Sequence, residues 1–192
     1  PTQRIQEENP LYGIKSEAGQ TTDRNRVLGS FNARYQPVDW FNIEGNLSYD
    51  RLEYQNVDYL PLGFQSIDAG TETGYYSRYN SSDESLNASV TASFIQEFGD
   101  LSTQTRFRAL IENGTFQSTT AEGNEFLTRG VKSLSATAPA SQEVGSYMSE
   151  IRSRGYFGIT NLDYKDKYIV DLMVRRDGSS LFGSEERWHT YY

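Results

Sequence analysis

The stretch Phe41-Asn42-Ile43-Glu44-Gly45-Asn46-Leu47-Ser48-Tyr49-Asp50 decides the fold. Apolar or small residues fill every odd position and polar residues fill every even one, which is the period of a strand with one apolar and one polar face. The eight steps from Phe41 to Tyr49 cover about 27 Å at roughly 3.3 Å per residue, close to the ~25 Å apolar band of a membrane barrel. The stretch therefore predicts a strand of membrane-crossing length.

The same alternation recurs along the chain. Five further strands are expected, at residues 27–35, 86–94, 101–112, 151–164 and 168–176. Turns at 36–39, 98–100 and 165–167 join the strands in pairs, because Pro37, Asp39 and Gly99 are typical turn residues. We expect three antiparallel hairpins, joined by long polar links near 51–84 and 113–150.

The connections alternate between short and long, as in a transmembrane barrel with short periplasmic turns and long external loops. Aromatic residues gather at the short-turn ends, where an interfacial ring would lie. They are Tyr35, Trp40, Phe41, Phe94, Phe98, Tyr164 and Tyr168. We expect an all-β chain whose antiparallel up-and-down strands form part of a large transmembrane β-barrel over residues 1–192. The alternative is a soluble β-sandwich that binds carbohydrate or mediates adhesion.

Composition excludes several classes of function. The chain has 192 residues, 26 acidic and 18 basic side chains and a net charge of −8, which argues against nucleic-acid binding. It contains no cysteine, so disulfides and thiolate sites are excluded. Neither a signal peptide nor a long apolar run suited to a spanning helix is present in the sequence.

No catalytic residue, metal site or cofactor is expected. His189 is the single histidine and is expected in a loop, so neither a catalytic triad nor a multi-histidine metal site can form within the chain. A few carboxylates could be read as a calcium loop, but they lack its ligand spacing and are interpreted as solvated loop charges. They are Asp50, Glu53 and Asp58, and the pair Asp83 and Glu84.

Two sets of side chains are candidates for contact with a transported molecule. The charged residues on the polar strand faces are expected to line the lumen, where they are solvated or help to seat a plug. They are Glu44, Arg106, Arg108 and Arg175. The aromatic residues of the first long link could stack on sugar rings or pack against a neighbouring loop. They are Tyr75, Tyr76 and Tyr79.

A motif near the C-terminal end closely resembles the SusC/RagA family of TonB-dependent outer-membrane transporters. It comprises the turn Tyr164-Lys165-Asp166-Lys167-Tyr168, the strand end Arg175-Arg176-Asp177-Gly178-Ser179-Ser180, then Phe182-Gly183 and Arg187-Trp188. In that family the same elements occur with this order and spacing. Weaker likeness covers most of the chain, at residues 9–10, 35–40 and 94–99, whereas residues 189–192 depart from the family pattern.

The resemblance implies a bacterial outer-membrane transporter without enzyme activity. Family members carry a plug and a TonB-contacting segment ahead of a barrel of about 22 strands, so the chain is expected to be an interior piece that lacks both. Implied partners are outer-membrane lipid, a SusD-like lipoprotein and the TonB complex. The implied cargo is a bulky nutrient, glycan or peptide, and the motif does not distinguish between the two.

Overall fold

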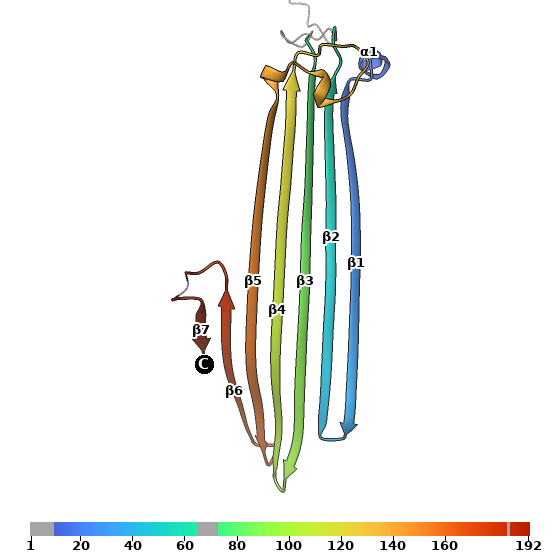
Figure 1. Cartoon of the computed structure of the whole chain (residues 1–192). Coiled ribbons are helices and arrows are strands. Elements are labelled where there is room, and N and C mark those ends of the chain that lie inside the picture. The colour runs from blue at the N-terminus through green and yellow to red at the C-terminus, as the bar shows by residue number, and fades with distance from the viewer. Residues whose placement is uncertain (1–9, 65–72, 184) are drawn as a thin grey trace, which may run out of the picture. The chain divides into compact units, whose positions relative to one another are not determined.

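The computed structural model describes residues 10–64, 73–183 and 185–192. Its strands form one sheet in which each strand neighbours the next along the chain (Figure 1). They are β1 (Gly19–Val38), β2 (Phe41–Leu60), β3 (Tyr75–Phe98), β4 (Leu101–Asn124), β5 (Glu143–Tyr164), β6 (Tyr168–Ser179) and β7 (Trp188–Tyr191). The predicted all-β antiparallel fold and its six strands are confirmed, and β7 is an additional strand.

The strands β1 to β5 are much longer than their apolar alternation indicated. Each contains 20 to 24 residues. The expectation of long irregular links at 51–84 and 113–150 is therefore wrong, since most of these residues belong to strands. The connections that remain are 61–74 and 125–142. Both faces of the added strand segments are largely polar, so an apolar period of two is absent there.

The turn after β1 is also shorter than expected. It consists of residues 39–40, and Pro37 lies inside β1 near its end. Pro37 is the penultimate residue of β1, so its missing N–H falls where the strand ends. The 36–39 turn is therefore corrected to Asp39 and Trp40.

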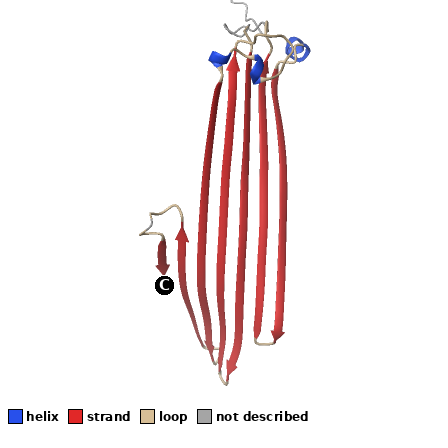
Figure 2. Cartoon of the chain, viewed as in Figure 1, coloured by secondary structure: helices blue, strands red, loops and turns tan. Residues whose placement is uncertain are grey.

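The described residues contain three short helical segments that the sequence did not predict (Figure 2). They are α1 (Pro10–Lys15) and two 3₁₀ turns, η1 (Leu134–Ala136) and η2 (Pro139–Ser141), the latter two in the connection after β4. In the part of the chain that the structure describes, no helix has the length and apolar character needed to cross a membrane.

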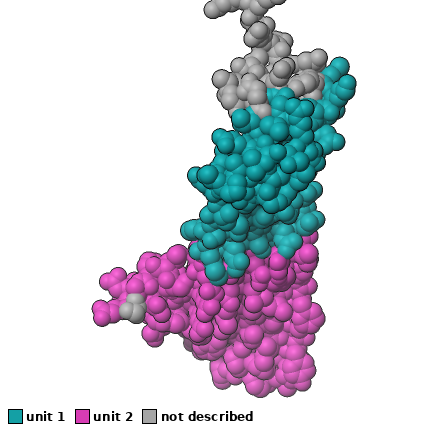
Figure 3. Space-filling model, turned by 45° about the horizontal axis from the view of Figure 1, so that its top comes forward, with its two compact units in different colours: residues 1–25, 52–82, 116–148 teal, residues 26–51, 83–115, 149–192 magenta. Residues whose placement is uncertain are grey.

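The chain divides into two compact units (Figure 3). Unit 1 comprises residues 1–25, 52–82 and 116–148, and unit 2 comprises 26–51, 83–115 and 149–192. The boundary falls within the long strands, so β1 to β5 each contribute residues to both units. Unit 1 contains the connections 61–74 and 125–142, whereas unit 2 contains the three short turns.

Unit 1 has a small buried core beneath its connections. The rings of Tyr59 and Phe126 meet edge to face at 5.6 Å, and Tyr76 completes the cluster. Thr137 is fully buried, and its hydroxyl donates to the Leu134 carbonyl at 2.7 Å. The connection 125–142 is therefore a folded segment with its own internal hydrogen bonds.

The β5–β6 hairpin of unit 2 closes through a tight turn. Tyr164 pairs with Tyr168, and the backbone N–H of Lys167 donates to the Tyr164 carbonyl at 3.2 Å. Lys165 and Asp166 between them have φ of 59° and 53°. Two successive left-handed residues define the type I′ turn, whose twist matches that of a hairpin.

Candidate functional site

One face of unit 2 carries large apolar side chains that are exposed. On β1, Phe31 and Tyr35 are 66% and 68% exposed, and on β4 Phe107 is 56% exposed. We call this surface the apolar face, and its further exposed members include Val27, Leu47, Val90, Leu172 and Val174. Large exposed apolar side chains gathered on one face mark contact with a membrane or a partner.

Aromatic rings lie together at the short-turn end of this face. Phe94 of β3 contacts Trp40, Phe41 and Phe107, at ring-centroid distances of 6.4, 4.9 and 6.3 Å. Trp40 is half exposed. The expected gathering of aromatic residues at this end is therefore present for Trp40, Phe41 and Phe94, and Phe107 joins them. Amphipathic rings of this type favour a membrane interface.

The opposite face of unit 2, called the polar face for its charged side chains, is hollowed into a cleft of about 620 Å³ that both polar and apolar residues line. Glu44, Arg106 and Arg108 line it, so the structure brings together three of the four residues expected in the lumen. Glu44 pairs with Arg34 at 3.4 Å, and Arg108 donates to the Ser89 hydroxyl at 3.3 Å. That this face lines a lumen stays a prediction.

Arg175, the fourth of these residues, lies on the same face of the sheet. Its backbone pairs with Phe157, another residue of the cleft, and its guanidinium lies 4.6 Å from the centre of that ring. Arg175 also forms an ion pair with Asp177. The first Arg and the Asp of the Arg-Arg-Asp-Gly motif thus interact on the polar face.

The other half of the motif lies on the apolar face, around Trp188 of β7. Trp188 pairs with Gly178, and a Cβ at Gly178 would meet the indole at 2.9 Å. The indole also stacks on Tyr156 at 5.9 Å and lies 5.3 Å from the Arg176 guanidinium. The Trp188 indole therefore packs directly on the backbone of Gly178, where a side chain would collide with it. This packing explains why the motif has a glycine at the position that pairs with the tryptophan.

The Tyr-Lys-Asp-Lys-Tyr turn contacts the neighbouring turn between β3 and β4. The backbone N–H of Lys165 donates to the Asp100 carbonyl at 2.9 Å, and its ammonium lies 3.3 Å from the Asp100 carboxylate. The same ammonium lies over the Tyr164 ring at 5.3 Å. Lys165 therefore joins two successive hairpins at their turns.

The three tyrosines that were expected in a loop lie on β3 instead, so that placement is wrong. Tyr75 donates to the Glu122 carboxylate at 3.2 Å, and burial, with that carboxylate nearby, raises the pKa of Tyr75. Tyr76 is buried in the unit 1 core, whereas Tyr79 meets Tyr54 at 5.9 Å. Neighbouring residues of a strand face opposite sides, so the three do not form one platform. Their stacking on sugars stays a prediction.

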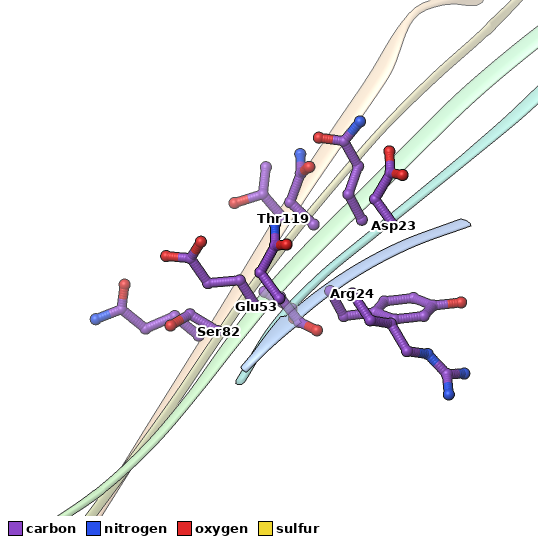
Figure 4. Close-up of a pocket in the computed structure, with 12 residues that line it drawn as sticks. Asp23, Arg24, Glu53, Ser82 and Thr119 are labelled. Atoms are coloured by element: carbon purple, nitrogen blue, oxygen red, sulfur yellow. The ribbon is translucent and has the colours of Figure 1, made fainter. Parts of the chain in front are cut away.

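A polar cleft of about 510 Å³ lies in unit 1 (Figure 4). Asp23, Glu53, Ser82 and Thr119 point to one side of the sheet, and Arg24 points to the other. Arg24 lies 5.2 Å from the centre of the Tyr54 ring. Arg24 was not predicted as a site residue, because its contact with Tyr54 joins two strands and no local sequence pattern indicates it.

The carboxylates expected in loops also lie on strands, β2 and β3, so their placement is corrected. Asp50 forms an ion pair with Arg26 at 2.6 Å, and Glu84 with Arg51 at 3.8 Å. Among the described residues no group of three potential ligands could hold a metal ion. His189 lies on β7 rather than in a loop, and its ring meets Phe182 at 5.4 Å.

Known proteins share both sequence and fold with this chain. It is 27% identical over 197 residues to the TonB-dependent receptor P26 of Formosa agariphila, and the match covers 95% of the chain. The RagAB peptide transporter superposes with a TM-score of 0.80 over 94% of the chain, at 16% identity. The open-open RagAB peptide importer gives 0.79 over 95%, at 18% identity. The chain resembles part of a TonB-dependent receptor barrel.

The chain spans about a fifth of the length of these relatives, 19% of the receptor and 20% of each of the two RagAB chains. No protein-family model matches it. The predicted resemblance to RagA-type TonB-dependent receptors is confirmed by the sequence match together with the fold. The matched proteins are a receptor and transporters by name, which agrees with the expectation that the chain is non-catalytic.

Proposed function

We propose that residues 1–192 are part of the barrel of an outer-membrane TonB-dependent transporter, with a plug and further strands outside the chain. The transporter imports a bulky nutrient, a glycan or a peptide, together with a SusD-like lipoprotein. Unit 2 lies in the bilayer with its apolar face toward lipid and its polar face toward the lumen. Unit 1 meets water rather than lipid.

The observation that carries this proposal is the contrast between the two faces of unit 2. Phe31, Leu47 and Phe107 are exposed on one side, and Glu44, Arg106 and Arg108 line a cleft on the other. The described strands form a single sheet, and a single sheet with one apolar and one polar face is the arrangement of a transmembrane barrel wall. Lipid is the environment that stabilises an exposed apolar face of this kind.

The proposed cargo and partner rest on the RagAB likeness. RagAB is a peptide transporter, and its low identity to this chain carries the fold alone. Glycan and peptide are therefore both retained as substrate classes. Charged and polar groups of the polar face would contact either cargo through hydrogen bonds in a hydrated lumen.

The test is an uptake assay with the complete protein that contains this chain. A deletion strain would be compared with the wild type during growth on a peptide mixture and on polysaccharide, each with TonB present or inactivated. We expect one nutrient to require both the protein and TonB, and a tagged SusD-like lipoprotein to copurify. Fractionation to the soluble phase, or growth on both nutrients unaffected by the deletion, would overturn the proposal.

A further inference from the structure

We propose that Arg154 and Arg187, beside Trp188, bind the phosphate of a lipid headgroup in the outer leaflet of the membrane. This inference rests on the proposed function, because it requires the apolar face to lie in lipid. The site is a cleft of about 300 Å³ in unit 2. Its lining includes Arg152, Arg154, Ser179, Ser180, Arg187 and Trp188.

Trp188 gives the site a fixed wall. The indole covers Gly178 and stacks on Tyr156, and the Arg176 guanidinium lies 5.3 Å from its ring centre. Ser179 also donates its backbone N–H to the Arg187 carbonyl at 3.1 Å, which ties Arg187 to the end of β6. This backbone hydrogen bond therefore holds Arg187 beside Ser179, and both residues line the cleft.

The cleft carries uncompensated positive charge. Arg152 forms an ion pair with Glu150 at 2.6 Å. Arg154 and Arg187 are exposed, and within residues 10–64, 73–183 and 185–192 neither has an ion pair. Glu185 and Glu186 are not among the residues that line the cleft. A guanidinium that retains its hydrogen-bond donors is suited to bidentate contact with phosphate.

The position along the strand selects a lipid phosphate rather than a free one. Arg154 stands ten residues from Tyr164 at the short turn, and a tilted strand crosses the bilayer core in about 9–11 residues. On β2, the charge of Arg51 likewise stands ten residues beyond Phe41. Arg154 is therefore at the level of the headgroups, where tryptophan is also favoured.

The apolar residues beside the cleft complete the argument for lipid. Val174 and Leu172 continue along β6 from Arg176 toward the short turn, on the same face, and both are more than half exposed. A phosphate held between the arginines would leave its acyl chains against these side chains. Neither free phosphate nor a soluble phosphorylated ligand gains this apolar contact.

The experiment compares lipids on the complete protein purified in detergent. Native mass spectrometry would count bound lipid A and its fully dephosphorylated form, offered in equal amounts, for the wild type and for Arg154→Ala/Arg187→Ala. Lys167→Ala, which removes an exposed charge in the β5–β6 turn at the opposite boundary, is the matched control. Inorganic phosphate alone is added in a competition arm.

We expect the wild type and the control to prefer the phosphorylated lipid by on the order of tenfold, and the double variant to lose that preference. An equal preference in the double variant, no preference in the wild type, or complete displacement by inorganic phosphate would each overturn the lipid site. Failure of the proposed function has a different signature, because a protein without a membrane barrel would show no heat-dependent shift in gel mobility with any lipid.

Discussion

The two units are built from segments of the same five strands, yet their surfaces differ. On β4, Phe107 and Ile111 in unit 2 are exposed apolar residues, whereas Gln117 and Thr119 at equivalent odd positions in unit 1 line a polar cleft. Both segments of β4 are β-strand. The strands therefore form in both units, whether their side chains are apolar or polar. The polarity of the side chains indicates the environment that suits each surface.

The units also differ in how they bury apolar groups. Unit 1 has an internal core, in which Tyr59, Tyr76 and Phe126 are each less than a tenth exposed. The aromatic contacts of unit 2 leave Trp40 and Phe107 about half exposed. This is the pattern expected if unit 1 meets water and unit 2 meets lipid, because hydrocarbon replaces an internal core as the apolar environment.

The largest expected effect comes from placing a charge on the apolar face. Leu47→Arg should destabilise the complete barrel by about 2–4 kcal/mol, because an arginine near the bilayer midplane is poorly solvated. Gln117→Arg, on the same side of the sheet in unit 1, should change the free energy of unfolding by less than about 0.5 kcal/mol. Urea unfolding of the reconstituted protein measures both, and equal tolerance of the two would remove the distinction between the units.

Truncating a ring should separate an internal core from a lipid-exposed cluster. Phe126→Ala leaves a cavity in unit 1 and should cost about 3 kcal/mol of local stability. Phe94→Ala should cost about 1 kcal/mol, since lipid fills the space and only the aromatic contacts are lost. Hydrogen exchange in each unit reports the two values. A larger loss for Phe94→Ala would contradict the assignment of lipid to unit 2.

A substitution at Gly178 tests whether this glycine of the Arg-Arg-Asp-Gly motif is needed for the packing of Trp188. Gly178→Ala places a Cβ at 2.9 Å from the indole and should cost about 1–2 kcal/mol, with a change in Trp188 fluorescence as the ring moves. Gly45→Ala is the control, because a Cβ at Gly45 meets nothing within 4 Å. An unchanged emission spectrum for Gly178→Ala would show that the ring does not lie on this glycine.

The smallest effect concerns a surface ion pair of unit 1. Lys132, 2.7 Å from the Glu17 carboxylate, lowers the pKa of Glu17 through its hydrogen bond and its charge. The pair therefore stabilises the folded state above the ordinary glutamate pKa of about 4 and loses this effect as the pH falls through the lowered value. After correction for the intrinsic pH dependence of exchange, the protection of amides in residues 125–142 should fall slightly on acidification, and Glu17→Gln should remove that response.

Sequence alone predicted much of unit 2 and little of unit 1. The alternation from Phe41 to Tyr49 identified β2 because its odd and even residues differ in polarity, and the same signal identified the unit 2 segments of β1, β3 and β4. In unit 1 polar residues occupy both faces, so Asp58 and Tyr79 were read as loop residues. Period-two patterns detect a difference between faces, and a strand with two polar faces lacks it.

The candidate sites show the same limit. The sequence correctly placed Glu44, Arg106 and Arg108 on one face of the sheet. That prediction needs only the alternation of side chains along each strand and the positions of the three turns. The cluster of Tyr156, Arg176, Gly178 and Trp188 could not be predicted, because it depends on β7, a strand of four residues. Its register brings Trp188 opposite Gly178, and no local pattern in residues 180–192 indicates that pairing.

The type I′ turn at Lys165 and Asp166 has a consequence for the order of folding. Closing three residues between β5 and β6 costs little chain entropy, and hairpins form in about 1–10 μs. The 125–142 connection must instead arrange two 3₁₀ turns and a buried threonine before β4 and β5 are joined. The β5–β6 hairpin is therefore suited to form early in folding. The ion pair between Lys165 and Asp100 would then stabilise the docking of the β3–β4 turn against it.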